Sequence, residues 1–265
     1  MKSMPDLKNW RPPPENARIN QFATRCFRDT GDGDYITARL AMRAGLGANF
    51  LWSAQQAIEK YLKCILMLNR KNTADLSHDI DRALKRINTQ LPFKIVLRKP
   101  EQEVFDHLHD WRGDRYLISS FHVFEKELLK LDLLVWKLRQ YCVPLDLVHY
   151  ADSPSEEVLL RNVALIEAGL LGPAKMGHIR GAVLELILAD KSHPARPALV
   201  WRNARYSGKV LKTVRYTDNF QAVNAPLYIA PELADKVANY MRIPEVVLEG
   251  ARALAEHRKR TGEEA

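Results

Sequence analysis

The sequence predicts a mainly α-helical protein, in which an antiparallel helical bundle is followed by a C-terminal region of mixed α and β structure. Apolar residues recur at steps of three and four over several long segments, which is the periodicity of amphipathic helices. Between residues 197 and 229 the pattern changes to Val and Tyr residues among Gly, Asn and Pro, which favours short strands or hairpins. We therefore expect an irregular arm over residues 1–19, a bundle over 20–143 and the C-terminal region over 151–265.

The first half of the chain predicts bundle helices joined by short connections. One long apolar face begins at residue 51 and contains Leu51, Ala54, Ile58, Leu62 and Ile65. The TGDGD segment before it, residues 30–34, predicts a loop with Asp34 as a helix N-cap. Gly45-Leu46-Gly47 predicts a break between two helices. A shorter helix is expected over 79–87 with Ser77 as its cap, then a connector over 92–100 and a helix over 101–111.

The most regular pattern lies in the segment before Pro144. Its apolar residues alternate steps of four and three: Leu117, Phe121, Phe124, Leu128, Leu131, Val135 and Leu138. This seam predicts a long bundle helix that ends at Pro144. Leu129, Leu133 and Trp136 form a second apolar face, which we expect to meet a partner subunit.

The C-terminal region begins after a polar linker at residues 152–157. Helices are expected over 158–169 and 174–188. A final helix is expected over 231–260, interrupted or split at Pro244 because proline lacks the backbone donor that a helix interior needs.

Composition limits the class of protein. The 265 residues carry a net charge of +8, which permits a polyanionic partner. No apolar run approaches the 18 or so residues that cross a bilayer, and the first residues lack the apolar core of a secretory signal. Three widely spaced cysteines, without CxxC spacing, argue against a disulfide framework and a zinc ribbon. We expect a cytoplasmic protein without membrane contact.

The block DYITARLAMRAGLGANFLWSAQQAIEKYLKCILMLN, followed by LSHDIDRAL, resembles the HEPN family (higher eukaryotes and prokaryotes nucleotide-binding domain). The shared features are the pair Ala38-Arg39, the segment Gln55–Lys63 and the element His78-Asp79-Ile80. The resemblance implies a dimeric helical bundle with one of two functions. Some members are metal-independent endoribonucleases, including toxins of toxin–antitoxin pairs, whereas others are noncatalytic nucleotide-binding or interaction modules, often partners of a minimal nucleotidyltransferase.

Catalytic members of that family carry an arginine followed, after four to six residues, by a histidine near the start of the last bundle helix. Arg115 and His122 match this pattern, and in one helix they would share a face. The resemblance implies that His122 acts as general acid or base on RNA and that Arg115 stabilises the phosphate, without a metal or other cofactor. Tyr116 departs from the small or polar residue usual after the arginine, so a phosphate contact, a dimer contact or a plain surface position stays open.

Spacing alone does not single out this pair, because Arg252 and His257 also satisfy it. Some sequence features also have a purely structural interpretation. Glu59 and Lys63 have the spacing of a helix-stabilising ion pair, and His78-Asp79 suits a helix cap.

A basic strip without acidic residues runs from Lys191 to Arg215. The candidate nucleic-acid-binding residues in it are Lys191, Arg196, Trp201, Arg202, Arg205, Tyr206, Lys209, Lys212 and Arg215. Basic side chains can follow phosphates while aromatic rings stack on unpaired bases, although a plain exposed hairpin fits equally well. Glu103, His107 and Asp110 could also share a helix face as metal ligands, but a solvated polar face is the more common arrangement.

Overall fold

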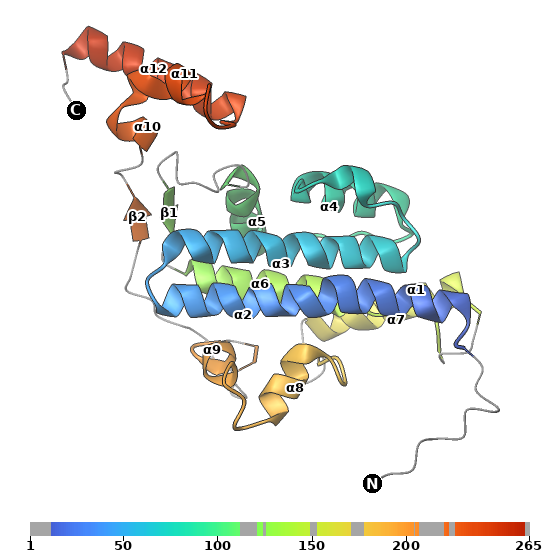
Figure 1. Ribbon diagram of the computed structural model, residues 1–265. Helices are drawn as coiled ribbons and strands as arrows, with labels where there is room; N and C mark the ends of the chain where they lie inside the picture. The colour runs from blue at the N-terminus through green and yellow to red at the C-terminus, as the bar shows by residue number, and fades with distance from the viewer. Residues whose placement is uncertain are drawn as a thin grey trace.

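The protein is mainly α-helical. The computed structural model describes residues 12–111, 121–123, 126–148, 153–170, 178–203, 205–206, 220–222 and 226–262. Figure 1 shows long helices packed side by side in the bundle, with a smaller helical unit at the C-terminal end of the chain. Among the described residues no helix is long and apolar enough to cross a membrane.

The first helical rod runs without interruption from Glu15 to Arg43. It consists of α1 (Glu15–Phe22), a π-helical segment (Ala23–Asp29) and α2 (Thr30–Arg43). The predicted loop at residues 30–34 is therefore wrong, because this segment is the first turn of α2. Tertiary contacts explain the difference. A Cβ on Gly31 would lie 3.3 Å from the Cβ of Lys60, so glycine here permits close packing against α3 (Gly47–Leu68).

The helices after this rod largely follow the sequence pattern. Gly45 has a φ of +74° at the predicted break, and α3 begins at Gly47. The predicted helix at 79–87 is confirmed as α4 (Ile80–Gln90), but its cap is Asp79, which accepts from the backbone N–H of Arg82 at 2.9 Å. The predicted helix at 101–111 is confirmed as α5 (Lys99–Trp111).

The predicted long helix through residues 117–138 is wrong at residues 121–123, which form a strand, and residues 117–120 and 124–125 lie outside the described residues. Helix α6 spans only Glu127–Gln140, after Lys126 in a left-handed conformation with a φ of 70°. Before it, β1 (Phe121–Val123) pairs antiparallel with β2 (Phe220–Ala222). The expected helical seam gives way here because a segment about one hundred residues later supplies backbone hydrogen-bond partners.

The C-terminal region contains helices of 4 to 17 residues, with few strand residues among those described. They are α7 (Glu156–Leu170), α8 (Val183–Ala189), α9 (Arg196–Val200), α10 (Pro226–Ile229), a 3₁₀ turn (Pro231–Leu233), α11 (Ala234–Val237) and α12 (Glu245–Thr261). The expected hairpins over 197–229 are thus limited to β2 in the described part, and α9 and α10 are helical. The predicted final helix over 231–260 is wrong over residues 238–244, because α11 ends at Val237. Its second part is confirmed as α12, which begins directly after Pro244.

Two separate hydrophobic clusters divide the structure. The large one joins the bundle helices to α7, α8, α9 and Tyr206, so the bundle core continues well past residue 143. The small one contains Leu227, Ala234, Ile243, Leu248 and Ala251. Residues 226–262 therefore have their own apolar core, in accordance with their position apart from the bundle helices in Figure 1.

Buried ion pairs connect the segment 178–206 to the bundle. Arg139 donates to both carboxylate oxygens of Asp32, at 2.7 and 2.8 Å, and to both oxygens of Glu185, at 2.7 Å each. Arg39 pairs with Asp132 and donates to the backbone oxygens of Ala198 and Trp201. A buried charge without a partner is very costly, so these contacts fix the position of the segment.

Candidate functional site

His122 lies in strand β1 and its side chain is exposed to solvent. In the strand pair it stands opposite Gln221 of β2. The prediction that His122 belongs to a bundle helix is therefore wrong. Arg115 lies outside the described residues, so the predicted alignment of the two side chains on one helix face has no support from the position of His122.

The imidazole of His122 stacks on a second imidazole. The ring of His107, from α5, lies with its centroid 5.4 Å from that of His122, and the two planes differ by 18°. The sequence placed His107 with Glu103 and Asp110, but the structure brings it to His122 instead. The two histidines are fifteen positions apart and belong to different elements, so no local spacing rule connects them.

Glu127, the first residue of α6, contacts the ring of His107 through its carboxyl group. Its Oε1 lies 2.9 Å from Nδ1 of His107, and its side chain is only 1% exposed. This distance is that of a hydrogen bond between the carboxyl group and the ring nitrogen, so Glu127 fixes the orientation of the His107 ring. Among the described residues, the second oxygen of Glu127 has no hydrogen-bond partner.

Helices α5 and α6 carry charges of opposite sign near His107. Glu103, one turn before His107, forms an ion pair with Lys130 of α6 at 2.8 Å. The Lys130 ammonium lowers the pKa of Glu103 below its usual value, by hydrogen bonding and by its charge. Glu103 is thus engaged by a lysine, and His107 by Glu127. No group of three or more His, Cys, Asp or Glu side chains in the described part of the chain is placed to hold a metal ion.

We refer to His122, His107 and Glu127 as the histidine cluster. It combines one exposed imidazole, one mostly buried imidazole and one buried carboxylate from β1, α5 and α6. Imidazoles exchange protons near neutral pH, and a carboxylate behind one of them fixes its orientation. The arrangement is suited to moving a proton at an exposed ligand.

The predicted basic strip is divided by the fold. Tyr206 is fully buried and stacks edge-on against Trp136 at 5.4 Å, so its ring cannot stack on a base. Its inclusion in a nucleic-acid surface is wrong. Arg205 is half-buried, with its guanidinium 5.5 Å from the centre of the Trp136 ring. Burial lowers the pKa of Arg205 from its usual value.

The exposed remainder of the strip lies around α9. Trp201 is half-buried, with the guanidinium of Arg202 at 5.3 Å from its ring centre and that of Arg43 at 5.6 Å. Lys191 is exposed, whereas Arg196 donates to the backbone oxygen of Leu188 at 3.1 Å. Lys209, Lys212 and Arg215 lie outside the described residues.

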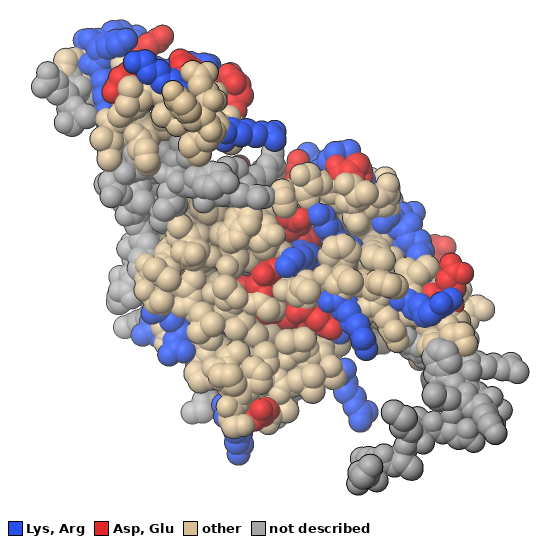
Figure 2. Space-filling model, viewed as in Figure 1, with Lys and Arg blue, Asp and Glu red and all other residues tan. Residues whose placement is uncertain are grey.

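Charge is spread rather than concentrated on the face that Figure 2 presents. Basic and acidic side chains alternate across the bundle there, and many of the visible arginines and lysines lie next to an acid. The net charge of +8 therefore does not form a single positive field on this face.

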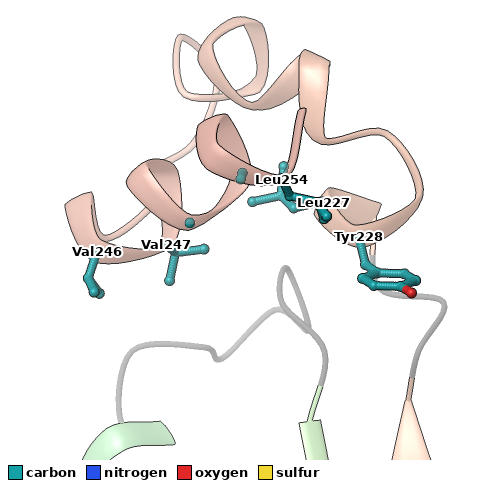
Figure 3. A pocket seen from close by; sticks show the side chains of 7 residues that line it. Leu227, Tyr228, Val246, Val247 and Leu254 are labelled. Carbon is teal, nitrogen blue, oxygen red and sulfur yellow. The ribbon is translucent and has the colours of Figure 1, made fainter. Parts of the chain in front are cut away.

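An apolar pocket of about 360 Å³ lies on the C-terminal helical unit. Figure 3 shows the labelled side chains of α10 and α12 projecting to one side of that unit. The residues that line it are Leu227, Tyr228, Val246, Val247, Gly250, Ala251 and Leu254. None of them carries a charge, which distinguishes this pocket from the histidine cluster.

The second apolar face of the last bundle helix is occupied by the chain itself. Trp136 is 2% exposed and contacts Tyr206 and His178, whose ring lies 5.7 Å away. The expectation that this face meets a partner subunit is therefore wrong at Trp136, because residues 178–206 cover it.

Residues that carry the HEPN resemblance have structural roles here. Arg39 is fully buried and paired with Asp132. Lys63 pairs with Glu59 at 2.7 Å, and Nδ1 of His78 lies 2.9 Å from the same carboxylate. These contacts, together with the Asp79 cap, confirm the structural interpretation of Glu59, Lys63, His78 and Asp79.

Comparisons of the chain with protein-family models, curated proteins and solved structures found no significant match. The HEPN resemblance thus stays a prediction from the sequence, and the histidine cluster must be interpreted from its own chemistry.

Proposed function

We propose that the protein acts on RNA as a metal-independent endoribonuclease in which His122 is the general acid or base and Arg115 stabilises the phosphate. The observation that supports this proposal is the exposed imidazole of His122, stacked on His107, which a buried carboxylate holds. The resemblance of residues 20–143 to HEPN proteins supplies the substrate class.

The reaction requires only proton transfer and charge stabilisation. A neutral His122 takes the proton of an RNA 2′-hydroxyl, and the 2′-oxygen forms a bond to the adjacent phosphorus. The bond from phosphorus to the 5′-oxygen breaks, and that oxygen takes a proton from solvent. The products are a 2′,3′-cyclic phosphate and a 5′-hydroxyl, and His122 returns its proton to water. The guanidinium of Arg115 offsets the extra negative charge on phosphate in the transition state.

The test is cleavage of structured and unstructured RNA in EDTA by wild-type protein and by His122→Ala. We expect loss of about 10²–10⁴-fold in rate, the usual contribution of a general acid or base. His257→Ala is the matched control, because His257 belongs to the other arginine–histidine spacing in the chain, and its Arg252 is engaged by Asp235 and Glu245. Equal cleavage by wild type and His122→Ala contradicts the assigned role.

The second candidate is a noncatalytic module that binds nucleotides or a partner such as a nucleotidyltransferase or an antitoxin. Tyr116 favours it, because a bulky residue directly follows the arginine. Absence of cleavage by wild type, together with retained binding of a labelled nucleotide or RNA, supports this candidate over the first.

Homodimer formation is part of both proposals, since the resemblance implies a site shared by two subunits. Light scattering after size exclusion measures the mass directly. For a catalytic dimer, specific activity falls on dilution below the dimer dissociation constant.

A further inference from the structure

We infer that a pocket at the end of the bundle binds a small zwitterionic amino acid with an apolar side chain. The pocket has a volume of about 290 Å³ and lies where the ends of α3 and α4 meet the starts of α1 and α7. Figure 1 shows α1 and α7 toward the end of the bundle opposite to β1, so this pocket is separate from the histidine cluster. The inference goes beyond the proposed function and does not depend on it.

Part of the pocket wall is apolar. Leu68 and Leu159 line the pocket and are buried, and Leu91 and Pro92 line it from the end of α4. A wall of this kind favours a ligand with an apolar body. The volume lies at the lower limit of small-ligand sites, which begin at roughly 300 Å³, so it favours a ligand the size of an amino acid over a larger one.

Charged residues of both signs line the same pocket. Arg70 and Lys71 follow the C-terminal end of α3, whereas Glu156 begins α7. Asp146 lies on the side of α7, because its backbone oxygen accepts from the backbone N–H of Ser155 at 2.9 Å. A helix C-terminus favours cations and a helix N-terminus favours anions, which accounts for the sign of the charge at each helix end. The pocket therefore has a positive side and a negative side.

The half-buried charges of Lys71 and Asp146 are unpaired. In the described part of the chain, neither the ammonium of Lys71 nor the carboxylate of Asp146 forms an ion pair or a side-chain hydrogen bond. Half-buried lysines elsewhere in the bundle are paired, as Lys130 is with Glu103 at 2.8 Å. A charge that is partly removed from water without a partner is unfavourable, so a ligand that brings the opposite charge gains binding free energy.

The balance of charge decides between ligand classes. A nucleotide or another polyanion would meet the carboxylates of Asp146 and Glu156 as well as the cations, and like charges repel. A simple carboxylic acid or a simple amine would leave one of the half-buried charges unpaired. A zwitterionic amino acid places its carboxylate at Lys71 and its ammonium at Asp146. Its apolar side chain then lies against Leu68 and Leu159.

Arg70 fixes the positive side of the pocket. Its φ of 58° lies in the left-handed region, which favours glycine and is uncommon for arginine. Its guanidinium donates to Oδ1 of Asn20 at 2.9 Å and to the backbone oxygen of Asn16 at 3.2 Å, both in α1. These contacts join α1 to the end of α3, so two walls of the pocket are in place before a ligand binds. Because the acceptors are uncharged, the positive charge of Arg70 adds to that of Lys71.

The experiment is an NMR shift titration of the full-length protein at neutral pH with L-leucine and with L-phenylalanine. 4-Methylpentanoate, which lacks the ammonium of leucine, and L-leucinamide, which lacks its carboxylate, are the matched ligands. We expect saturable binding of L-leucine or L-phenylalanine, and binding of each leucine analogue weakened by about tenfold or more. Absence of saturable shifts with both amino acids up to about 10 mM, where a Kd of about 1 mM is detectable, overturns the inference.

Two variants assign the contacts. Lys71→Met should weaken L-leucine to the affinity of L-leucinamide, and Asp146→Asn should weaken it to the affinity of 4-methylpentanoate. L-Leucinamide should bind Lys71→Met as it binds wild type, because it lacks the group that Lys71 contacts. Lys85→Met is the matched control, because Lys85 lies on α4 outside the pocket and is paired with Asp81 at 3.0 Å. It should leave all the affinities unchanged.

Both pocket variants are expected to fold, since Lys71 and Asp146 make no side-chain hydrogen bond in the described part of the chain. Circular dichroism checks this, and Lys71→Gln or Asp146→Ser replaces a variant that does not fold. Binding of L-leucine that neither substitution weakens, or equal binding of L-leucine and its two analogues, overturns the inference. The titration contains no RNA, so its failure leaves the proposed function intact, and absence of RNA cleavage leaves this pocket intact.

Discussion

Replacement of Arg39 by methionine removes the cation that pairs with Asp132 in the bundle core. Both side chains are fully buried, and Asp132 also accepts from Tyr35 at 2.6 Å. Arg39 further donates to the backbone oxygens of Ala198 and Trp201. The substitution thus leaves a buried carboxylate without its cation and two carbonyls without this donor.

The expected loss of stability is large. Removal of one partner from a buried ion pair costs about 3–5 kcal/mol, and each carbonyl that loses its donor adds about 1–3 kcal/mol. The sum is comparable to the whole unfolding free energy of a typical domain, about 5–15 kcal/mol. Asp132→Asn alone is expected to cost about 3 kcal/mol, because it leaves Arg39 charged and buried but keeps an acceptor for Tyr35.

A double-mutant cycle with urea unfolding tests this reasoning. Asp132→Asn should stabilise the Arg39→Met variant, because it removes the uncompensated charge, so the coupling energy should be about 3 kcal/mol or more. The exposed pair Asp81 and Lys85 is the control, and its coupling should stay below about 0.5 kcal/mol. If Asp132→Asn costs the same in both backgrounds, the two charges do not act as a pair.

Two further predictions concern helix packing and alkaline pH. Gly33→Ala should stabilise the protein by about 0.5–1 kcal/mol, because Gly33 lies in helix α2 and an added Cβ would meet nothing within 4 Å. Gly31→Val, in contrast, should destabilise the protein by about 1–3 kcal/mol, because the larger side chain would overlap with α3. Thermal unfolding of the two variants measures both effects, and equal melting temperatures would contradict the close-packing argument. Burial raises the pKa of four of the nine tyrosines, so folding favours their neutral form. The folding free energy that this contributes is complete below about pH 10 and is lost as the pH rises above it. These tyrosines are Tyr35, Tyr61, Tyr141 and Tyr206. Absorbance at 295 nm should show them ionising only as the helical circular dichroism is lost, and titration of all nine near pH 10 in folded protein would contradict their burial.

Local pattern was sufficient for much of the helical architecture. Helices α3, α4, α5 and α7, the break at Gly45 and the interruption at Pro244 follow from apolar spacing and from Gly and Pro. These elements are predictable because their apolar faces and ends are encoded within a few residues. The segment at 30–34 failed because Gly and Asp favour loops locally, whereas Asp32 pairs here with Arg139, about one hundred residues away.

Distant pairing also explains why the site was only partly predictable. The resemblance points to His122, but its strand depends on β2, which lies ninety-seven positions further along at the nearest pair, Val123 and Phe220. The sequence pattern places His107 only on an acidic helix face, and nothing in it marks Glu127. A periodic pattern describes neighbours within one element, so it cannot bring three elements together.

The buried contacts also limit where a second subunit could complete the site. Trp136 lies under Tyr206, and the bonds from Arg39 and Arg139 hold residues 178–206 in that position. Separating this segment from α6 would expose the buried charges, at a cost that an interface would have to offset. A second subunit can contact the exposed side chain of His122 without separating this segment from α6. A dimer with a shared site is therefore expected to assemble around the paired strands β1 and β2, and not on the Trp136 face of α6.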